Sequence, residues 1–240
     1  MEYVIVHSGK GGVGKSTVAL HLALSLRSFF KVGLMDLDIH GPNTVRMSGG
    51  EFKVEAKGDM LVPPVYKGMK YISIGMMLPD KDTPIIWRGP LKTSLIKQFT
   101  EKTLWEDTEL MICDMPPGTG DEAIDLSNSV KIKGSVLVTT PSKLSVNDLK
   151  RSVTFMKKLE IPIIGVVVNM SKIFCPECNS EFEIPSKFLD DYLNSESLKV
   201  LANIPFIPEI ASKQDKGCLD NNELISPVFE KLAENVKDFL

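Results

Sequence analysis

The sequence predicts an α/β fold with a doubly wound, mostly parallel sheet flanked by helices. The first observation is a glycine-rich segment, Gly9–Thr17, that joins the apolar run Tyr3–Ser8 to a stretch with helical periodicity, Lys15–Phe29. The second is a series of short, apolar, β-rich runs, which are typical of strands buried on both faces of a parallel sheet. The third is that helical stretches lie between several of these runs, and such alternation favours a doubly wound sheet.

Each element in the first half of the chain follows from a local pattern. Val18, Leu22 and Leu26 recur at helical spacing and are expected to face the sheet. Pro90 suits the first turn of a helix, and the turn residues Lys57-Gly58-Asp59 predict a β-hairpin. The predicted elements are strands over Tyr3–Ser8, Lys31–Asp36, Tyr71–Gly75 and Leu110–Asp114, a hairpin over residues 52–62, and helices over Lys15–Phe29 and Pro90–Thr100.

The second half continues the same alternation of apolar runs and amphipathic stretches. The predicted strands are Ser135–Thr140, Ile163–Asn169 and Val200–Ile204, and the predicted helices are Glu122–Val130, Val146–Leu159, Pro185–Leu193 and Glu223–Leu240. We find no internal repeat, low-complexity tract or linker. Residues 1–240 are therefore predicted to form a single domain.

Composition excludes several classes of function. A chain of 240 residues can bury one substantial core. The net charge of −3 gives no case for nucleic-acid binding, and no apolar run is long enough to span a bilayer. The first strand begins too early for a signal peptide. We therefore expect a cytoplasmic protein with neither a membrane nor a nucleic-acid partner, in which the four cysteines are thiols or metal ligands rather than disulfides.

The segment GKGGVGKST fills every position of the phosphate-binding pattern G-x-x-x-x-G-K-[ST]. Loop N–H groups and the start of the following helix are expected to bind phosphate oxygens. Lys15 should reach the β- and γ-phosphates, the Ser16 hydroxyl should ligate Mg²⁺, and Thr17 should assist at the phosphates. The predicted nucleotide-binding residues here are Gly9, Lys10, Gly11, Gly12, Val13, Gly14, Lys15, Ser16 and Thr17.

The extra lysine in this segment, Lys10, resembles the signature lysine of the deviant Walker A ATPases. That group includes MinD, ParA, the nitrogenase iron protein and the Mrp/ApbC iron–sulfur carriers. In those families the lysine reaches across a dimer interface to the nucleotide of the partner subunit. The resemblance implies a homodimer around ATP, with Lys10 and Lys15 as catalytic residues. The alternative is a lysine that only adds positive charge near phosphate.

Three acids follow strands that should end beside the loop. Asp36 and Asp38 lie in DLDIHGPN, which resembles the switch I region of the same group. That resemblance implies that Asp38 orients the attacking water, and we expect Asp36 to support Mg²⁺ through water. Asp114 follows an apolar strand, as a Walker B acid does, and is expected to hold the Mg²⁺ shell. The alternative for Asp38 is an acid at a turn or helix start.

Two further segments are candidates for binding the base. Asn169 ends a predicted strand, and related ATPases bind adenine with an asparagine at this place. Pro205 and Phe206 follow the last predicted strand and resemble the segment that packs on the base. The alternative is that these residues simply end strands.

The pair Cys175 and Cys178, in CPEC, distinguishes this chain from other ATPases. Soft thiolates favour Zn or Fe–S clusters, but a closed site of either kind usually needs four protein ligands. Cys113 and Cys218 are not spaced as a second pair, and Cys113 is expected to be a small buried hydrophobe. A homodimer would supply four thiolates, because a two-fold axis apposes identical patches.

The motifs GKGGVGKST, DLDIHGPN, WRGP, DMPPGTGD and CPEC occur in this order and together resemble the Mrp/ApbC family of iron–sulfur cluster carrier ATPases. The resemblance implies slow, Mg-dependent ATP hydrolysis and a [4Fe–4S] cluster bound by Cys175 and Cys178 of two subunits and passed to apo-proteins. One alternative is a dimeric ATPase whose two subunits are bridged by Zn and which serves a different client. The other is a MinD- or ParA-like positioning switch, which the mixed charges of the C-terminal helix and the acidic balance disfavour.

Overall fold

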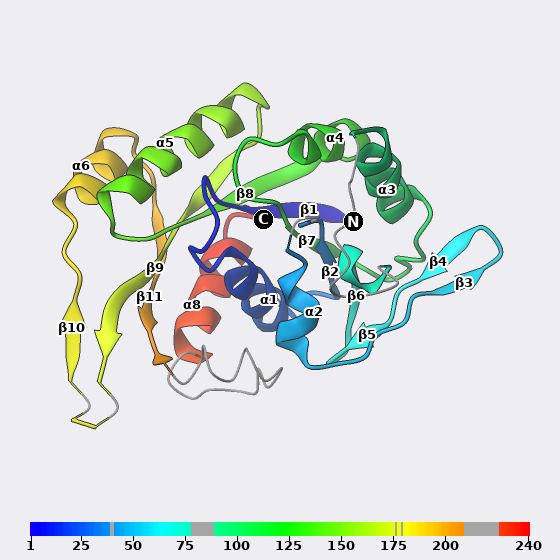
Figure 1. The fold of residues 1–240 in the computed structure, drawn as a ribbon, viewed down its shortest axis with the longest axis horizontal. Coiled ribbons are helices and arrows are strands. Elements are labelled where there is room, and N and C mark those ends of the chain that lie inside the picture. Colours follow the sequence, from blue (N-terminus) through cyan, green and yellow to red (C-terminus); the bar gives the residue numbers. More distant parts are fainter. Residues whose placement is uncertain (39–40, 78–88, 176, 179, 209–225) are drawn as a thin grey trace.

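The computed structural model describes residues 1–38, 41–77, 89–175, 177–178, 180–208 and 226–240. Its strands are β1 (Glu2–His7), β2 (Val32–Asp36), β3 (Glu55–Lys57), β4 (Met60–Val62), β5 (Val65–Tyr66), β6 (Met69–Ser73), β7 (Leu110–Asp114), β8 (Ile132–Thr139), β9 (Ile163–Phe174), β10 (Glu181–Glu183) and β11 (Val200–Phe206). The main sheet has the order β10-β9-β8-β1-β7-β2-β6-β5, and β11 pairs with β9 (Figure 1). The strands from β6 through β9 to β11 are parallel, whereas β5 and β10 are antiparallel to their neighbours.

Two layers of helices cover the sheet. The helices are α1 (Lys15–Leu26), α2 (Asn43–Ser48), α3 (Gly89–Glu101), α4 (Asp121–Ser129), α5 (Lys143–Lys158), α6 (Lys187–Ser195) and α8 (Ser226–Lys237). Figure 1 shows α1, α2 and α8 on one face and α3 to α6 on the other. Strand β1 serves both layers, because Val4 and Val6 join the first core and Tyr3 and Ile5 join the second. The predicted fold class is confirmed. None of the helices described is both long and apolar enough to cross a membrane.

Most predicted elements are present, with boundaries that differ by a few residues. Helix α1 ends at Leu26, before the predicted end, because the chain turns there and the Phe29 and Phe30 N–H groups both bond to the Leu26 carbonyl. The hairpin turns at Gly58, as predicted, although its first strand begins only at Glu55. Helix α2 and the short strands β5 and β10 were absent from the sequence prediction, because each has too few residues to show a period.

Strand β9 runs five residues beyond its predicted end at Asn169. On one edge, β11 pairs with it as far as Ile173. Strand β10 pairs with residues from Lys172 to Phe174 of β9. It therefore lies on the opposite edge of β9, beyond Val168, where the pairing of β9 with β8 ends. The polar residues of this extension do not resemble a buried strand, and pairing with distant segments determines their conformation. The β9–β10 hairpin therefore projects beyond the sheet (Figure 1).

His7, at the end of β1, is a buried titratable group that affects stability. It is 1% exposed, and neither ring nitrogen has a hydrogen-bond partner among the residues described. Burial, followed by the charge of Lys15, lowers the pKa of His7 from 6.5 to about 4. Between these two values the unfolded chain binds a proton that the folded chain does not. The contribution of His7 to stability is therefore unfavourable in acid and fades as the pH rises above 6.5.

We expect His7→Leu to reduce the acid sensitivity of folding. From pH 7.5 to pH 5, the free energy of unfolding should fall by about 2 kcal/mol less in the variant than in wild type. Urea unfolding at the two pH values measures the difference. Asp36, whose pKa burial raises to about 7, has the opposite pH dependence but is present in both proteins. Equal losses in the two proteins would contradict the expectation.

Candidate functional site

The glycine-rich loop joins β1 to α1 at the carboxyl end of the sheet. Gly12 and Gly14 have φ values of 78° and 84°, a left-handed conformation that favours glycine. A Cβ on Gly14 would also lie 2.2 Å from the Asn169 side-chain nitrogen. That nitrogen donates a hydrogen bond of 2.9 Å to the Val13 carbonyl. The loop therefore requires glycine at this position and is fastened to β9 by Asn169.

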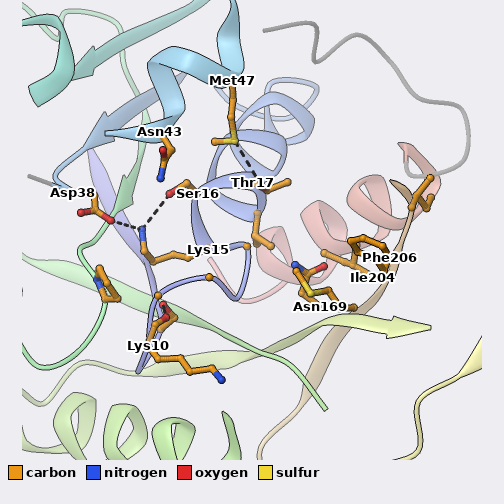
Figure 2. Close-up of a pocket in the computed structure, with 18 of the residues that line it drawn as sticks. Lys10, Lys15, Ser16, Thr17, Asp38, Asn43, Met47, Asn169, Ile204 and Phe206 are labelled. Carbon is orange, nitrogen blue, oxygen red and sulfur yellow. Dashed lines mark hydrogen bonds and ion pairs between the residues drawn. The ribbon is translucent and has the colours of Figure 1, made fainter. Parts of the chain in front are cut away.

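A cavity of about 670 Å³ opens above the loop (Figure 2). This volume is in the range of sites for small ligands and cofactors. Of the predicted residues, those lining the cavity are Lys10, Gly11, Gly12, Gly14, Lys15, Ser16, Thr17, Asp38, Asn169, Pro205 and Phe206. The structure thus brings together residues from the loop, the end of β2, β9 and β11. Gly9 instead packs against α5, where a Cβ would lie 2.2 Å from the Asp148 carbonyl oxygen.

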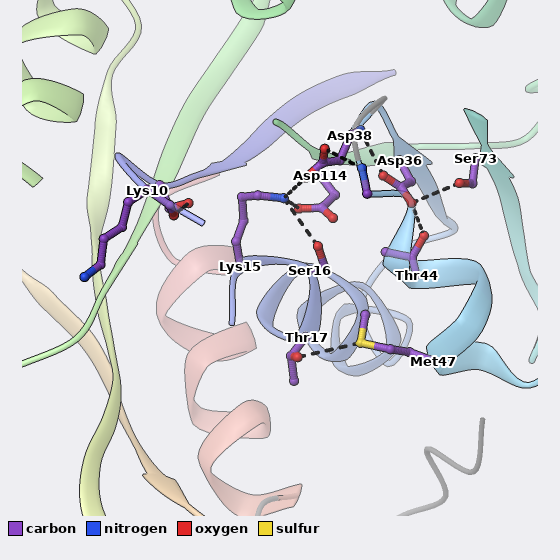
Figure 3. Close-up of polar contacts among 12 residues, drawn as sticks. Lys10, Lys15, Ser16, Thr17, Asp36, Asp38, Thr44, Met47, Ser73 and Asp114 are labelled. Atoms are coloured by element: carbon purple, nitrogen blue, oxygen red, sulfur yellow. Dashed lines mark hydrogen bonds and ion pairs between the residues drawn. The ribbon is translucent and has the colours of Figure 1, made fainter. Parts of the chain in front are cut away.

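Lys15 is the centre of a buried charge cluster in the cavity floor (Figure 3). Its Nζ lies 2.6 Å from Asp114 Oδ1 and 3.5 Å from Asp38 Oδ2, and it donates to Ser16 Oγ at 3.3 Å. Lys15 itself is 6% exposed. Burial acts to lower its pKa, but the charges of Asp114 and Asp38 outweigh this effect and the pKa is raised. The ammonium group therefore neutralises the acids predicted to act on metal and water.

Asp114 fits a role in holding Mg²⁺. Its Oδ1 bonds to Lys15, whereas its buried Oδ2 has no hydrogen-bond partner in the described part of the chain. Mg²⁺ prefers oxygen ligands and keeps several waters and substrate phosphates in its shell. Among the residues described, no three His, Cys, Asp or Glu side chains gather to hold a metal. Ser16 and Asp114 would therefore share the ion with phosphates and water.

Asp36 is held behind the cavity rather than in its lining. Its Oδ2 accepts hydrogen bonds from the Thr44 and Ser73 hydroxyls, and its Oδ1 accepts one from the Asp38 backbone N–H. Burial, followed by the charge of Asp114, raises its pKa to about 7. Asp36 thereby ties the end of β2 to α2 and β6. Its predicted support of Mg²⁺ through water stays a prediction.

Helix α2 adds residues that the sequence analysis missed. Asn43, Arg46 and Met47 line the cavity, and the Thr17 hydroxyl lies 3.7 Å from the Met47 sulfur. The only local signal was a helix start after Gly41-Pro42. At the other end of the cavity, Asn169, Ile204 and Phe206 lie together (Figure 2). The prediction that Asn169, Pro205 and Phe206 bind the base is compatible with this placement and stays a prediction.

The tip of the β9–β10 hairpin carries Cys175 and Cys178 as free thiols, the first half-buried and the second exposed. The Cys175 N–H bonds to the Ser180 carbonyl at 3.0 Å and closes the tip. Hydrogen bonds from Ser180, then from Cys175, lower the pKa of Cys178, which favours the thiolate that binds metal. Cys113 is fully buried, and burial raises the pKa of its thiol, so its structural interpretation is confirmed. Cys218 and the Trp87-Arg88 part of WRGP lie outside the described residues.

Comparison with known proteins identifies the family of this chain and several of its relatives. The chain matches the family described as "ParA: NUBPL iron-transfer P-loop NTPase" over residues 1–237. It is 41% identical over 218 residues to an iron-sulfur cluster carrier protein of Aquifex aeolicus, covering 89% of this chain and 60% of that protein. It is 41% identical over 226 residues to a cytosolic Fe-S cluster assembly factor NUBP2 homolog of Dictyostelium discoideum, covering 89% and 84%.

A solved structure of a nucleotide-binding protein shares the fold. The nucleotide-binding protein of Archaeoglobus fulgidus, in complex with ADP, superposes with a TM-score of 0.77 at 28% identity, over 91% of this chain and 87% of that one. The chain spans less than two thirds of the length of the Aquifex relative, so the match concerns the part that the two share. Since the family match extends over nearly the whole chain, this protein belongs to the iron-transfer P-loop NTPases of the ParA/NUBPL family.

Proposed function

We propose that this protein is an ATP-dependent carrier or scaffold that binds a [4Fe–4S] cluster between two subunits and transfers it to apo-proteins. The observation that supports this most directly is the cysteine hairpin. It presents two thiols at a projecting tip, one of them with a lowered pKa. Two thiolates are half of what such a cluster needs, and a two-fold dimer supplies the other half. Relatives named as iron–sulfur carriers and assembly factors support the same function.

The nucleotide site would control the state of the dimer. Lys15 and the loop N–H groups would bind the phosphates, and Ser16 and Asp114 would hold Mg²⁺, which neutralises phosphate charge when bound. Asp38 would orient a water molecule for attack on the γ-phosphate. Lys10 of the partner subunit would stabilise the charge that develops there. Because hydrolysis depends on positioning, separation of the subunits would stop it.

The experiment that tests the function is anaerobic reconstitution of the protein with iron and sulfide. We expect about four iron and four sulfide per dimer. A Cys175→Ser/Cys178→Ser double variant should lose them, and Cys113→Ser serves as the matched control because that thiol is buried away from the tip. Transfer to an apo-ferredoxin would establish carriage. Zinc alone, or iron that survives loss of both tip cysteines, would contradict the proposal and favour a Zn-stapled ATPase.

A further inference from the structure

Met170 has an unusual backbone conformation at the point where the nucleotide cavity meets the cysteine hairpin. Its φ is 55°, in the left-handed region that residues with a Cβ rarely adopt. The other described non-glycine residues with positive φ, such as Glu160, lie in turns, whereas Met170 lies within strand β9. Such a conformation persists only where the surroundings impose it, and it is found most often at functional sites.

The pairing of β9 shows a bulge at this position. Asn169 pairs with Ile204 of β11, and Ile173 pairs with Phe206. Four steps along β9 therefore oppose two steps along β11, which is the signature of extra residues in one strand. Pro205, which has no N–H to donate, lies opposite the bulge.

After the bulge, the side chains of β9 lie on the opposite faces of the sheet from those that a regular strand would give them. Val168 and Phe174 are six residues apart, so in a regular strand their side chains would share a face. Instead Val168 packs in the core under α5, and Phe174 packs against the core under α1 and α8. A slip of this kind reverses every later side chain. The backbone at Met170 therefore decides which way Cys175 leaves the sheet.

The same residue contacts the nucleotide site. Met170 lines the cavity, and its neighbour Asn169 bonds to the Val13 carbonyl in the phosphate loop. From Asn169 to Cys175 is only about 20 Å along the strand. A ligand that fills the cavity would therefore contact Met170 and the loop that Asn169 holds, and a movement of either would act on the bulge.

We propose that the Met170 bulge is a positioning element that couples nucleotide binding to the presentation of Cys175 and Cys178 within one subunit. The proposal rests on the proposed function in taking these cysteines as the working thiols. It adds a route inside the subunit to any effect that nucleotide exerts through the dimer interface. Met170 is a positioning residue, because it acts through the hairpin and not on the cluster.

The test measures thiol reactivity in protein without a cluster. Full-length Cys218→Ser protein is alkylated with N-ethylmaleimide, with and without saturating Mg-ADP, and the rates at Cys175 and Cys178 are followed by mass spectrometry. In the protein with Cys218→Ser as its only change, ADP should change the alkylation rate by about fivefold or more. A factor of about five is the lower end of the range typical of coupling between two binding sites. Met170→Val should abolish the ADP effect, since a β-branched residue strongly disfavours positive φ.

Three companion variants separate positioning from stability. Met170→Asn should keep the ADP effect, because asparagine tolerates the left-handed conformation. Met170→Ala, a milder change, should fold and show a reduced effect. Glu160→Val places the same strain at the same φ of 55° in a turn after α5 and should leave the effect intact. ADP affinity is measured for each variant so that every protein is compared at saturation.

Distinct results would overturn each part of the argument. The coupling is wrong if ADP leaves the wild-type rates unchanged, if Met170→Val or Met170→Ala responds to ADP as wild type does, or if Glu160→Val loses the response equally. Wild-type rates that ignore ADP, in a protein that still carries and transfers a cluster, would reject the coupling alone. Rates that follow ADP in a protein that binds no cluster would reject carriage alone.

Discussion

Replacing Lys15 with glutamine is expected to create affinity for a divalent metal in the absence of nucleotide. In the structure the Lys15 ammonium lies 2.6 Å from Asp114 and 3.5 Å from Asp38, so it neutralises these two carboxylates. Removing one partner of a buried ion pair leaves an uncompensated charge. A metal ion relieves that charge, and we expect Mn²⁺ to bind at least about 10-fold more tightly to Lys15→Gln than to wild type.

Mn²⁺ titration followed by electron paramagnetic resonance measures this affinity without any turnover. The same variant should bind ADP about 10- to 100-fold more weakly, because a charge-assisted hydrogen bond to phosphate is lost. Lys10→Gln is the matched control, since Lys10 lies away from the acids and its loss should leave Mn²⁺ affinity unchanged (Figure 3). Equal Mn²⁺ binding by Lys15→Gln and wild type would show that the lysine does not occupy the metal position.

Such a lysine would couple the binding of nucleotide to the binding of metal. Phosphate and carboxylate compete for the same ammonium group, so an arriving nucleotide draws Lys15 away from Asp114. The freed carboxylate then becomes available to the metal that accompanies the phosphates. Nucleotide and metal should therefore bind with positive coupling, and each should raise the affinity for the other by the same factor.

The sequence predicted the components of this site but not the ion pair at its centre. The motif identified Lys15, and the strand pattern identified Asp114. The rule that ligands bind at the carboxyl ends of parallel strands brings the two together. Their direct contact joins residues 99 positions apart in the chain, and no local sequence pattern specifies such a contact.

Long-range pairing explains most of what the sequence left out. Strand β9 was predicted to end at Asn169, because its apolar run ends there, yet pairing with β11 and β10 extends it to Phe174. The left-handed Met170 has no local signal, since methionine is not a residue type that favours this conformation. Ser73, which helps to fix Asp36, lies 37 positions from it in the sequence. The motifs therefore predicted the residues of the site better than the residues and strand pairings that hold them in place.

Replacing Lys10 with alanine is expected to lower ATP turnover by about 10³-fold while leaving the binding of ADP by a single subunit nearly unchanged. The Lys10 side chain extends away from Lys15 and Asp38 of its own subunit (Figure 3). In the proposed dimer it would act on the nucleotide of the partner subunit. Charged groups that complete a phosphoryl-transfer site from a second protein contribute about 10³- to 10⁵-fold to the rate. A loss of about 10³-fold, measured as phosphate release, with ADP affinity within about threefold of wild type, is the expected result.

A mixing experiment decides whether Lys10 acts within its own subunit or across the dimer. Lys10→Ala and Asp38→Ala are each inactive as homodimers if both residues are needed. In a mixed dimer, action across the interface gives one site with an intact Asp38 from one subunit and an intact Lys10 from the other. Half of the dimers in an equal mixture are mixed, and each has one complete site of two, so about a quarter of the wild-type rate should return. Action within one subunit leaves every site incomplete, and the mixture would stay as inactive as its components.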